Sequence, residues 1–307
     1  MITFLTGDND YAIKAEIDHL KDEFIKMHGS DGLEQYAAKE LELNKLPDLI
    51  SGGSLFSALR LVIVRDIGEN KELAEAIAER AKDVDDSTTL VLSQVLPDKR
   101  TRWYNALKTQ AKTLAQLRGS GLVRWLVDEA NNRKSDLMLA DARYLITLVG
   151  EDQWRLSSEL DKLLNSGQTI DQKLIDKLVE PSQEETIFQL TDLVVKGQVE
   201  PALALYRRLR LSEIDPHQFI GTLSWQLNAL LVVKTNQGQS SSALASKSGL
   251  SPFVIDRLKP LARRLTAKQL KESMRLALEA DFEMKQTGSD PDQRAKLLIG
   301  QLGQVIS

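Results

Sequence analysis

The sequence predicts a parallel α/β domain followed by two all-α domains. In the first third of the chain, short apolar runs rich in β-branched residues alternate with segments whose apolar residues recur every three or four positions. Beyond Gly119-Ser120-Gly121 the strand-like runs stop and only helical spacing remains. Since the strand-like runs are continuously apolar, they indicate a parallel sheet covered on both faces. We expect domains at residues 1–118, 119–182 and 183–307.

The strands of the first domain are predicted from the apolar runs, and its helices from apolar residues spaced three or four positions apart. Ile2–Thr6 is a predicted strand, and Gly7-Asp8-Asn9-Asp10 is a turn with a helix N-cap. The helix over 11–27 places Ile13, Ile17, Leu20 and Phe24 on one face. Further strands are expected near 33–38, at 59–65, at 88–93 and near 113–117, with helices at 71–82 and 99–112.

The remainder of the chain predicts helices separated by short polar loops. The first three are expected at 122–133, 139–149 and 153–164, and a longer helical block begins near Glu184. Asn165-Ser166-Gly167 and Glu180-Pro181-Ser182 mark loops between them. This pattern predicts a small helical domain followed by a larger one.

The composition excludes several classes of site. The chain of 307 residues has no cysteine, which removes disulfides, thiolate nucleophiles and cysteine zinc sites. Its three histidines, His19, His28 and His217, lack the spacing of a metal site, so no metal is expected. A net charge of −4 provides no broad basic field for binding nucleic acid alone. No apolar stretch is long enough for a membrane span, and we expect a cytoplasmic protein without membrane contact.

The first turn has the position of a phosphate-binding loop without its residues. Such a loop needs the spacing G-x-x-x-x-G-K-[ST], so that backbone N–H groups, a lysine and a hydroxyl contact the phosphates and magnesium. The sequence here is GDNDYAIK, with one glycine, two aspartates and no Lys-Ser/Thr pair. We therefore expect Gly7, Asp8, Asn9 and Asp10 to form a degenerate loop that binds no nucleotide, and an ATPase is disfavoured.

Other candidate motifs are also weak. Gly119-Ser120-Gly121 lacks the third glycine of a dinucleotide loop and is expected to be a hinge between domains. The acidic doublets Asp85-Asp86 and Glu184-Glu185 are expected on a solvated surface. Residues 242–258 have the spacing of a helix-turn-helix, which leaves a DNA-binding regulator as the alternative function. Its second helix begins with Ser251, Pro252 and Phe253 rather than base-reading side chains, so packing of two short helices is favoured.

Three ordered blocks of the sequence resemble the delta subunit of the bacterial DNA polymerase III clamp loader. Residues 122–165 are similar to the central block of that family, with a tryptophan helix, a glycine-acidic turn and the ELxKL pattern at Glu159–Leu163. Residues 201–234 resemble the first helices of its third domain. Residues 251–302 resemble its end, including the acidic-then-lysine pattern from Asp281 to Lys285. The likeness covers nearly the whole chain.

The resemblance implies a fold, a role and a set of partners. It implies an AAA+-like first domain that does not use nucleotide, and a third domain that assembles side by side with other loader subunits, as in a collar. The implied protein has no enzymatic activity or cofactor of its own and is a subunit of the DNA polymerase III holoenzyme. Its implied partners are the sliding clamp (the beta subunit), the ATPase subunits, delta prime and primed DNA. The absence of cysteine disfavours delta prime itself, which usually carries a cysteine zinc cluster.

The resemblance also implies the residues that contact the clamp. In the delta family the clamp-binding element ends in a Leu-Phe pair just before a strand, and Ser54, Leu55 and Phe56 match it ahead of 59–65. The implied function is to bind the clamp and hold one ring interface open during loading. The family often has an apolar residue where Gly53 stands, which predicts a narrower anchor. Gly52 and Gly53 are expected to form a flexible mount from which the pair projects.

The Leu-Phe pair is too small to be the whole interface. Burial of a Leu and a Phe contributes roughly 3 to 6 kcal/mol, whereas association costs on the order of 4 to 15 kcal/mol. Further clamp contacts are expected from Leu46–Ile50 and from the loop after Arg65. DNA contact within the assembled loader is expected through basic clusters at Arg207-Arg208-Arg210 or Arg263-Arg264, which equally suit a solvated face or an interface with other loader proteins.

Overall fold

The chain divides into two compact units. The computed structural model describes residues 1–52, 58–286 and 288–306, except for the side chains of Glu184 and Phe253. The first unit comprises Met1–Leu117 and the second Arg118–Ser307. The predicted boundary after residue 118 lies next to this division. The further boundary expected after residue 182 falls inside the second unit and stays a prediction.

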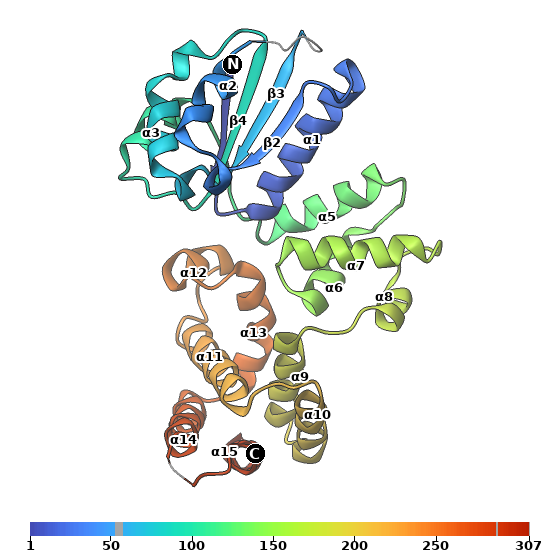
Figure 1. The fold of residues 1–307 in the computed structure, drawn as a ribbon. Coiled ribbons are helices and arrows are strands. Elements are labelled where there is room, and N and C mark those ends of the chain that lie inside the picture. Colours follow the sequence, from blue (N-terminus) through green and yellow to red (C-terminus); the bar gives the residue numbers. More distant parts are fainter. Residues whose placement is uncertain (53–57, 287, 307) are drawn as a thin grey trace. The chain divides into compact units, whose positions relative to one another are not determined.

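The first unit is built on a five-stranded sheet (Figure 1). The strand order is β2-β3-β4-β1-β5, and every neighbouring pair is parallel. This architecture confirms the predicted parallel α/β fold. The strands are β1 (Ile2–Gly7), β2 (Leu33–Ala37), β3 (Arg60–Arg65), β4 (Thr88–Val95) and β5 (Ala111–Leu114).

Helices cover both faces of this sheet. Alternate residues of β3 point to opposite faces, so Leu61 and Ile63 pack with α1 while Val62 and Val64 pack in a second cluster with α2, α3 and α4. Figure 1 shows α1 on one side of the sheet and α2 and α3 on the other. The helices are α1 (Asp10–His28), α2 (Leu46–Ile50), α3 (Lys71–Glu79) and α4 (Arg102–Leu107).

Strand β1 occupies the point at which the order of connections reverses. The chain leaves β1 for the β2 edge, returns through β3 and β4, and then passes over β1 to reach β5 on its other side. In open parallel sheets, ligands bind outside the carboxyl ends of the strands at such a point. The carboxyl end of β1 is Gly7, so the turn that the sequence singled out lies where this type of sheet places a ligand.

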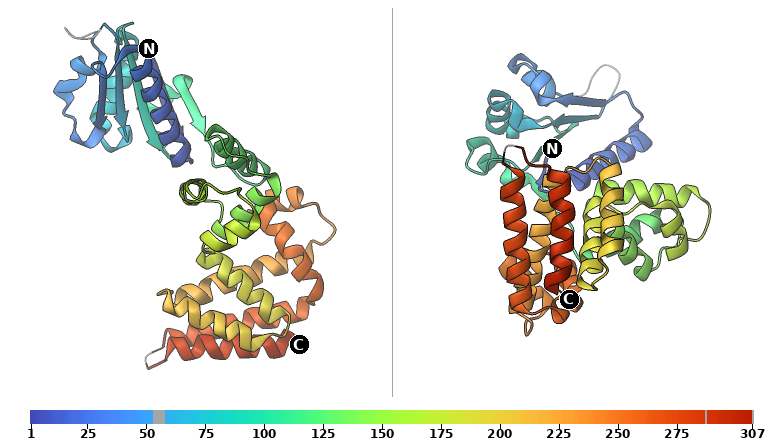
Figure 2. Two further views of the ribbon diagram at one scale, coloured as in Figure 1. Left: turned by 90° about the vertical axis from the view of Figure 1, so that its right-hand side faces the viewer. Right: turned by 90° about the horizontal axis from the view of Figure 1, so that it is seen from below.

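The second unit is helical throughout the residues that the structure describes. Its first four helices, α5 to α8, precede a larger group in which α14 and α15 lie side by side (Figure 2). The helices are α5 (Ser120–Asn132), α6 (Leu139–Val149), α7 (Gln153–Asn165), α8 (Gln172–Leu178), α9 (Gln183–Val195), α10 (Val199–Leu211), α11 (Pro216–Thr235), α12 (Ser241–Ser248), α13 (Pro252–Arg264), α14 (Ala267–Met284) and α15 (Pro291–Ile306). The predicted helical series is confirmed.

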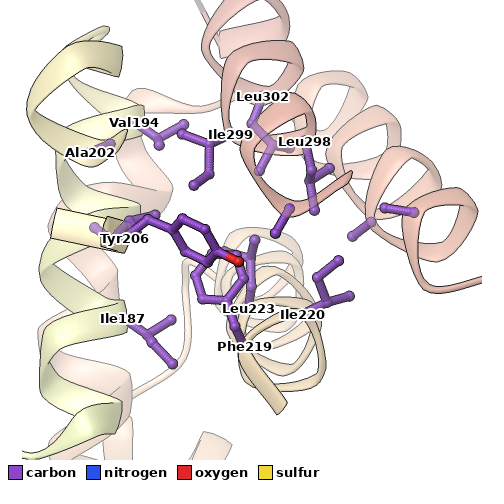
Figure 3. Packing of buried hydrophobic residues seen from close by; sticks show 14 of the residues in the cluster. Ile187, Val194, Ala202, Tyr206, Phe219, Ile220, Leu223, Leu298, Ile299 and Leu302 are labelled. Carbon is purple, nitrogen blue, oxygen red and sulfur yellow. The ribbon is translucent and has the colours of Figure 1, made fainter. Parts of the chain in front are cut away.

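An aromatic pair lies at the centre of the α9, α10, α11, α14 and α15 core (Figure 3). The Tyr206 and Phe219 rings are both fully buried, with centroids 4.8 Å apart. The Tyr206 hydroxyl donates to Asp292 of α15 at 3.0 Å, and the Arg210 guanidinium of α10 donates to the same carboxylate at 3.0 Å. Lys296 completes the group as an ion-pair partner of Asp292. This network connects α10 to α15 at the edge of an apolar core.

Candidate functional site

The turn between β1 and α1 is a tight cap for the helix. Asn9 is the N-cap residue of α1, and its side-chain oxygen accepts from the Ala12 amide at 2.9 Å. The Asn9 side chain is almost completely buried. An asparagine at this position satisfies one of the amides that a helix otherwise leaves without a partner. The amide that a bound phosphate could use is therefore engaged by the chain itself.

The segment after β5 lies against this turn and forms hydrogen bonds with it. The Asn9 amide donates to the Leu114 carbonyl at 3.2 Å, and the Asn9 side-chain nitrogen donates to the Ala115 carbonyl at 3.0 Å. The Gln116 amide donates to the Asp8 carboxylate at 2.7 Å, and its side chain donates to the Asp8 carbonyl at 2.9 Å. Residues 114–116 thus contact the turn through backbone and side chains.

Gly7 permits this close approach. Its φ of +136° suits glycine, and a Cβ at this position would overlap the Leu114 carbonyl oxygen. The Gly7 carbonyl accepts from the Leu96 amide at 2.9 Å, which fixes the turn from the β4 side as well. The glycine that a phosphate loop would use for a ligand is used here for the approach of β5. The four predicted residues Gly7 to Asp10 are therefore together in one turn. The backbone amide and the side-chain nitrogen of Asn9 both donate to the segment after β5, so neither is a free donor.

The predicted clamp-contact residues Ser54, Leu55 and Phe56 lie outside the described residues, and so does Gly53. The two sides of that segment are described. Ser51 follows the last turn of α2, and Arg60 begins β3. The geometry of these flanks defines where residues 53–57 are attached to the first unit.

A buried arginine ties the two flanks together. Arg60 is 6% exposed, and its guanidinium donates to the Ser51 carbonyl at 2.9 Å and to the Glu34 carboxylate of β2 at 2.9 Å. The Thr88 hydroxyl of β4 donates to the same Ser51 carbonyl at 2.6 Å. A buried guanidinium needs a charged partner and further acceptors, which Glu34 and the α2 terminus supply. Ser51 is therefore connected to β2, β3 and β4 through Arg60 and Thr88.

Gly52 lies close to the end of the Asp85 side chain and does not have a left-handed backbone. A Cβ at Gly52 would lie 2.9 Å from the Asp85 carboxylate, and its φ is not positive. The Asp85 amide donates to the Ile50 carbonyl at 3.0 Å, so the 85–88 turn lies directly beside this end of α2. Ser87 donates from its hydroxyl and its amide to the Asp85 carboxylate and lowers the pKa of that exposed group. The expectation that Gly52 and Gly53 form a flexible mount stays a prediction, and Gly53 lies outside the described residues.

Most apolar side chains of Leu46–Ile50 are unavailable for a partner. Leu46, Leu49 and Ile50 are buried in the core beneath α2 and α3. The segment is a short helix with Pro47 in its first turn, and this places its apolar residues on the inner face. Pro47 and Asp48 form the exposed part of the segment, so the expected clamp contact from Leu46–Ile50 stays a prediction and falls to these two residues.

The segment 242–258 forms two short helices that pack inward. Gly249 ends α12 in the left-handed conformation, and Pro252 begins α13. Leu244, Ile255 and Leu258 are buried against α9 and α11. Arg257, the first basic residue of α13, pairs with Glu185 instead of extending into solvent. These contacts agree with the packing interpretation.

The two acidic doublets differ in environment. Asp85 and Asp86 are exposed, as expected. Glu185 is 5% exposed and forms a two-pronged ion pair with Arg257, one contact of which is 2.8 Å. The expectation of a solvated Glu185 is wrong, because helix packing brings an arginine from 72 residues further along the chain onto it. That distance in sequence hides the pairing from any local pattern.

The two basic clusters, Arg207-Arg208-Arg210 and Arg263-Arg264, contain one arginine that bonds to other parts of the chain and four that are exposed. Arg210 binds Asp292 and the Ile214 carbonyl, which gives it a role in packing. Arg207, Arg208, Arg263 and Arg264 are exposed. DNA contact through these four residues stays a prediction.

The sequence did not indicate the Arg60 anchor, which is the group formed by Arg60 and its hydrogen-bond partners Glu34 and Ser51. Arg60 stands at the start of an otherwise apolar strand, and a cation in such a position indicates a buried ion pair. Its partners are Glu34 of β2 and Ser51 after α2, and Thr88 of β4 donates to the same Ser51 carbonyl, so only the sheet register brings them together. No group of three or more acidic or histidine side chains within the described ranges is arranged to hold a metal ion.

The sheet and its helices define the structural class of the first unit. The first unit is a parallel α/β domain in which helices cover both faces of a five-stranded sheet, and helices follow it along the chain. Among the described helices, none is long and apolar enough to cross a membrane.

Comparisons with known proteins agree with this class and narrow it. Residues 184–302 match the family model of the DNA polymerase III delta subunit, C-terminal domain. The structure of the Bacillus subtilis DNA clamp loader delta protein is similar with a TM-score of 0.64 and 20% identity, covering 99% of this chain and 95% of that one. The resemblance to the delta subunit that the sequence indicated is thereby confirmed in the C-terminal domain, and the likeness of fold extends along the chain.

More distant structural likenesses also occur. The RuvB Holliday junction branch migration motor of Thermotoga maritima matches with a TM-score of 0.40 and 10% identity, over 85% of this chain and 78% of that one. A DNA polymerase III gamma subunit-related protein of the same organism has a TM-score of 0.33 and 13% identity, over 100% of this chain and 95% of that one. Comparison with curated protein sequences finds no match.

Proposed function

We propose that this chain is the delta-type subunit of a clamp loader, which binds the sliding clamp through Leu55 and Phe56 and holds one ring interface open. The observation that carries the proposal is the match of residues 184–302 to the C-terminal domain of the delta family. The similarity of fold to a clamp loader delta protein over 99% of the chain supports it. The proposed partners are the sliding clamp, the loader ATPase subunits, delta prime and primed DNA.

The hydrogen bonds at Ser51 support clamp binding. The Ser51 carbonyl accepts from Arg60 and Thr88, so the chain is held to the sheet two residues before Gly53. Fixing the attachment reduces the conformational entropy that the segment loses on binding. Burial of both side chains in a partner pocket contributes roughly 3 to 6 kcal/mol. The remaining contacts have to come from exposed residues near this edge, since Leu46, Leu49 and Ile50 are buried.

The β1–α1 turn supports a role without nucleotide hydrolysis. Asn9 and Asp8 bind residues 114–116, and the turn contains no lysine or hydroxyl pair for phosphate and magnesium. In the proposed loader, partner ATPase subunits use ATP while this chain contributes binding energy. Moving a closed ring from about 1:99 to 99:1 open needs about 5.5 kcal/mol of preference for the open form. That preference sets how much of the binding energy must favour the open clamp.

The test is binding to the sliding clamp of the same organism by the full-length chain. We expect the wild-type protein to bind immobilised clamp, and the double variant Leu55→Ala/Phe56→Ala to lose more than about a hundredfold in affinity, since each tenfold is about 1.4 kcal/mol. The matched control is Met27→Ala/Leu43→Ala, which removes two exposed apolar side chains from the same unit. Absence of wild-type binding, or equal binding by the double variant and the control, would show that the proposal is wrong.

A further inference from the structure

A pocket of about 500 Å³ lies inside the second unit. Its apolar walls are Ile146 of α6, Phe188 of α9, Trp225 of α11 and Val254 of α13. This volume is in the range of sites that hold a small molecule or a large side chain. Gly150 and Gly221 also line the pocket. A Cβ added to either glycine would have no heavy atom within 4 Å, so the space beside both residues is open.

Two hydroxyl groups of the pocket lining, those of Thr147 and Thr222, have already used their protons. The Thr147 hydroxyl donates to the Arg143 carbonyl at 2.9 Å, and the Thr222 hydroxyl donates to the Gln218 carbonyl at 3.1 Å. Each hydroxyl retains lone pairs and no free proton. A ligand meets hydrogen-bond acceptors at both positions.

The charges of the lining leave one carboxylate uncompensated. Arg257 is the only cation among the described lining residues, and its guanidinium is paired with Glu185 and lies 4.3 Å from the centre of the Phe188 ring. Glu151, between α6 and α7, also lines the pocket. Its Oε1 atom is buried and has no hydrogen-bond partner among the residues that the structure describes. A buried carboxylate oxygen without a donor is costly, so a donor from outside the chain is expected.

Trp225 supplies a surface suited to a cation. Its side chain is 45% exposed although its ring packs edge-on to Phe188, with centroids 6.2 Å apart. Aromatic rings attract guanidinium and ammonium groups, and indole does so most strongly. The aliphatic stem of a long basic side chain packs well on apolar walls such as Ile146 and Val254 while its charged end reaches a carboxylate.

We propose that this pocket binds an arginine side chain of a partner protein, with its guanidinium on Glu151 and its stem between Ile146, Val254 and Trp225. Arginine fits better than lysine because its planar group bonds a carboxylate with two donors and also lies against an aromatic ring. The proposal does not depend on clamp binding, which involves the first unit.

The test uses the full-length chain and follows the indole N–H signal of Trp225 by NMR, assigned with Trp225→Phe. The probe is the peptide Ac-Gly-Arg-Gly-amide, and the matched probe replaces arginine with its neutral isostere citrulline. We expect a saturable shift with the arginine peptide and at least tenfold weaker binding of the citrulline peptide, because the charge-assisted hydrogen bond is lost. Agmatine, a free alkylguanidine, tests whether the guanidinium group comes from a small molecule instead of a protein side chain. Tenfold tighter binding of agmatine than of the peptide would overturn a protein side chain as occupant.

Variants of the pocket keep the result interpretable. Glu151→Gln is expected to weaken the arginine peptide about tenfold or more, while Glu180→Gln, an exposed glutamate nearby, leaves binding unchanged. Gly221→Met should block binding by filling the space without harming the fold, since methionine favours helix over glycine. Gly300→Met, at another open helical glycine, is its control. No shift with any probe, or unchanged affinity in Glu151→Gln, would mean that only water occupies the pocket and would overturn the proposal.

Discussion

At the scale of single residues, Gly7 and Gly52 have different physical reasons for being glycine. Gly7 has a positive φ, and any Cβ there would meet backbone atoms of Leu114, which cannot move aside without shifting β5. Gly52 has an ordinary φ and lies beside the end of the Asp85 side chain, which can rotate away. A substitution at Gly7 is therefore strained in two ways, whereas one at Gly52 requires the movement of one exposed carboxylate.

Asp292 is a single residue whose charge stabilises the C-terminal core. Lys296, followed by Tyr206 and Arg210, donates to its carboxylate and lowers the pKa of Asp292. A lowered folded-state pKa gives stability that is complete above the unfolded pKa of about 3.9 and is lost as the pH falls through the folded value. We expect Asp292→Asn to reduce the free energy of unfolding by about 2 kcal/mol at pH 7, with the difference shrinking below about pH 4.

Urea unfolding of both proteins at pH 7, 4 and 3 measures this dependence. Asp281→Asn is the control, because Asp281 pairs with Lys285 on the surface of α14, where such pairs contribute little. A stability difference for Asp292→Asn that is equally large at pH 3 and pH 7 would contradict a contribution from its charge.

At the scale of elements, Arg60 joins the end of α2 to β2 and β3. Arg60→Met keeps the stem and removes the guanidinium, which leaves Glu34 without its cationic partner and with only the Tyr36 hydroxyl as a donor among the described contacts. Because Glu34 is partly exposed, the expected loss is about 2 to 3 kcal/mol of unfolding free energy, below the cost at a fully buried pair. Under the proposed function, clamp affinity should also fall, since Ser51 loses its hydrogen bond with the Arg60 guanidinium.

The control for this change lies in the same strand. Arg65→Met makes the same substitution at the exposed end of β3 and should leave both unfolding and clamp binding near the wild-type values. Chemical denaturation and the clamp-binding assay measure the two effects separately. Equal stability of the two variants would rule out Arg60 as an anchor.

At the scale of the whole molecule, the two units should be separable by cleavage. Arg118 is exposed, and it precedes Gly119, the N-cap of α5, at the division between the units. We expect limited trypsin digestion to cleave first after Arg118 and to give fragments 1–118 and 119–307, because exposed connections are cleaved before packed helices. The N-terminal fragment should retain clamp binding, measured on the same immobilised clamp.

Two observations decide the cleavage prediction. Arg118→Gln removes the trypsin site and should delay fragmentation without changing clamp affinity. Clamp binding by the fragment 119–307 instead of 1–118 would contradict the assignment of the interface to the first unit.

The sequence predicted helices and strands with a regular apolar spacing better than those whose ends depend on contacts with residues far away in the sequence. The helix over 139–149 occurs with those bounds, and β1 extends only one residue beyond its prediction. The strand expected near 113–117 lies at Ala111–Leu114, because residues 115 and 116 bond to the β1–α1 turn instead of to the sheet. The helix expected at 99–112 is confined to Arg102–Leu107, and the short helix Leu46–Ile50 was missed because it has too few residues to show a period.

The candidate sites also differ in how far the sequence alone could predict them. The degenerate loop is visible in the sequence, since its absent lysine and glycines are local features. The Arg60 anchor, the Glu185–Arg257 pair and the pocket at Glu151 each combine residues from several elements. Such groupings depend on sheet register and helix packing, which no short stretch of sequence contains.

The contact of residues 114–116 with the β1–α1 turn makes a phosphate site difficult to introduce at this end of the sheet. Asp8 and Asn9 could be exchanged for the glycines and lysine of a working loop, yet the Leu114 carbonyl would still lie against Gly7. A nucleotide site would require redesign of two segments about a hundred residues apart in sequence, each of which stabilises the other. Under the proposed function, a lineage with this arrangement would have to lose stability before it could gain a phosphate site, so the fold itself favours leaving ATP to partner proteins.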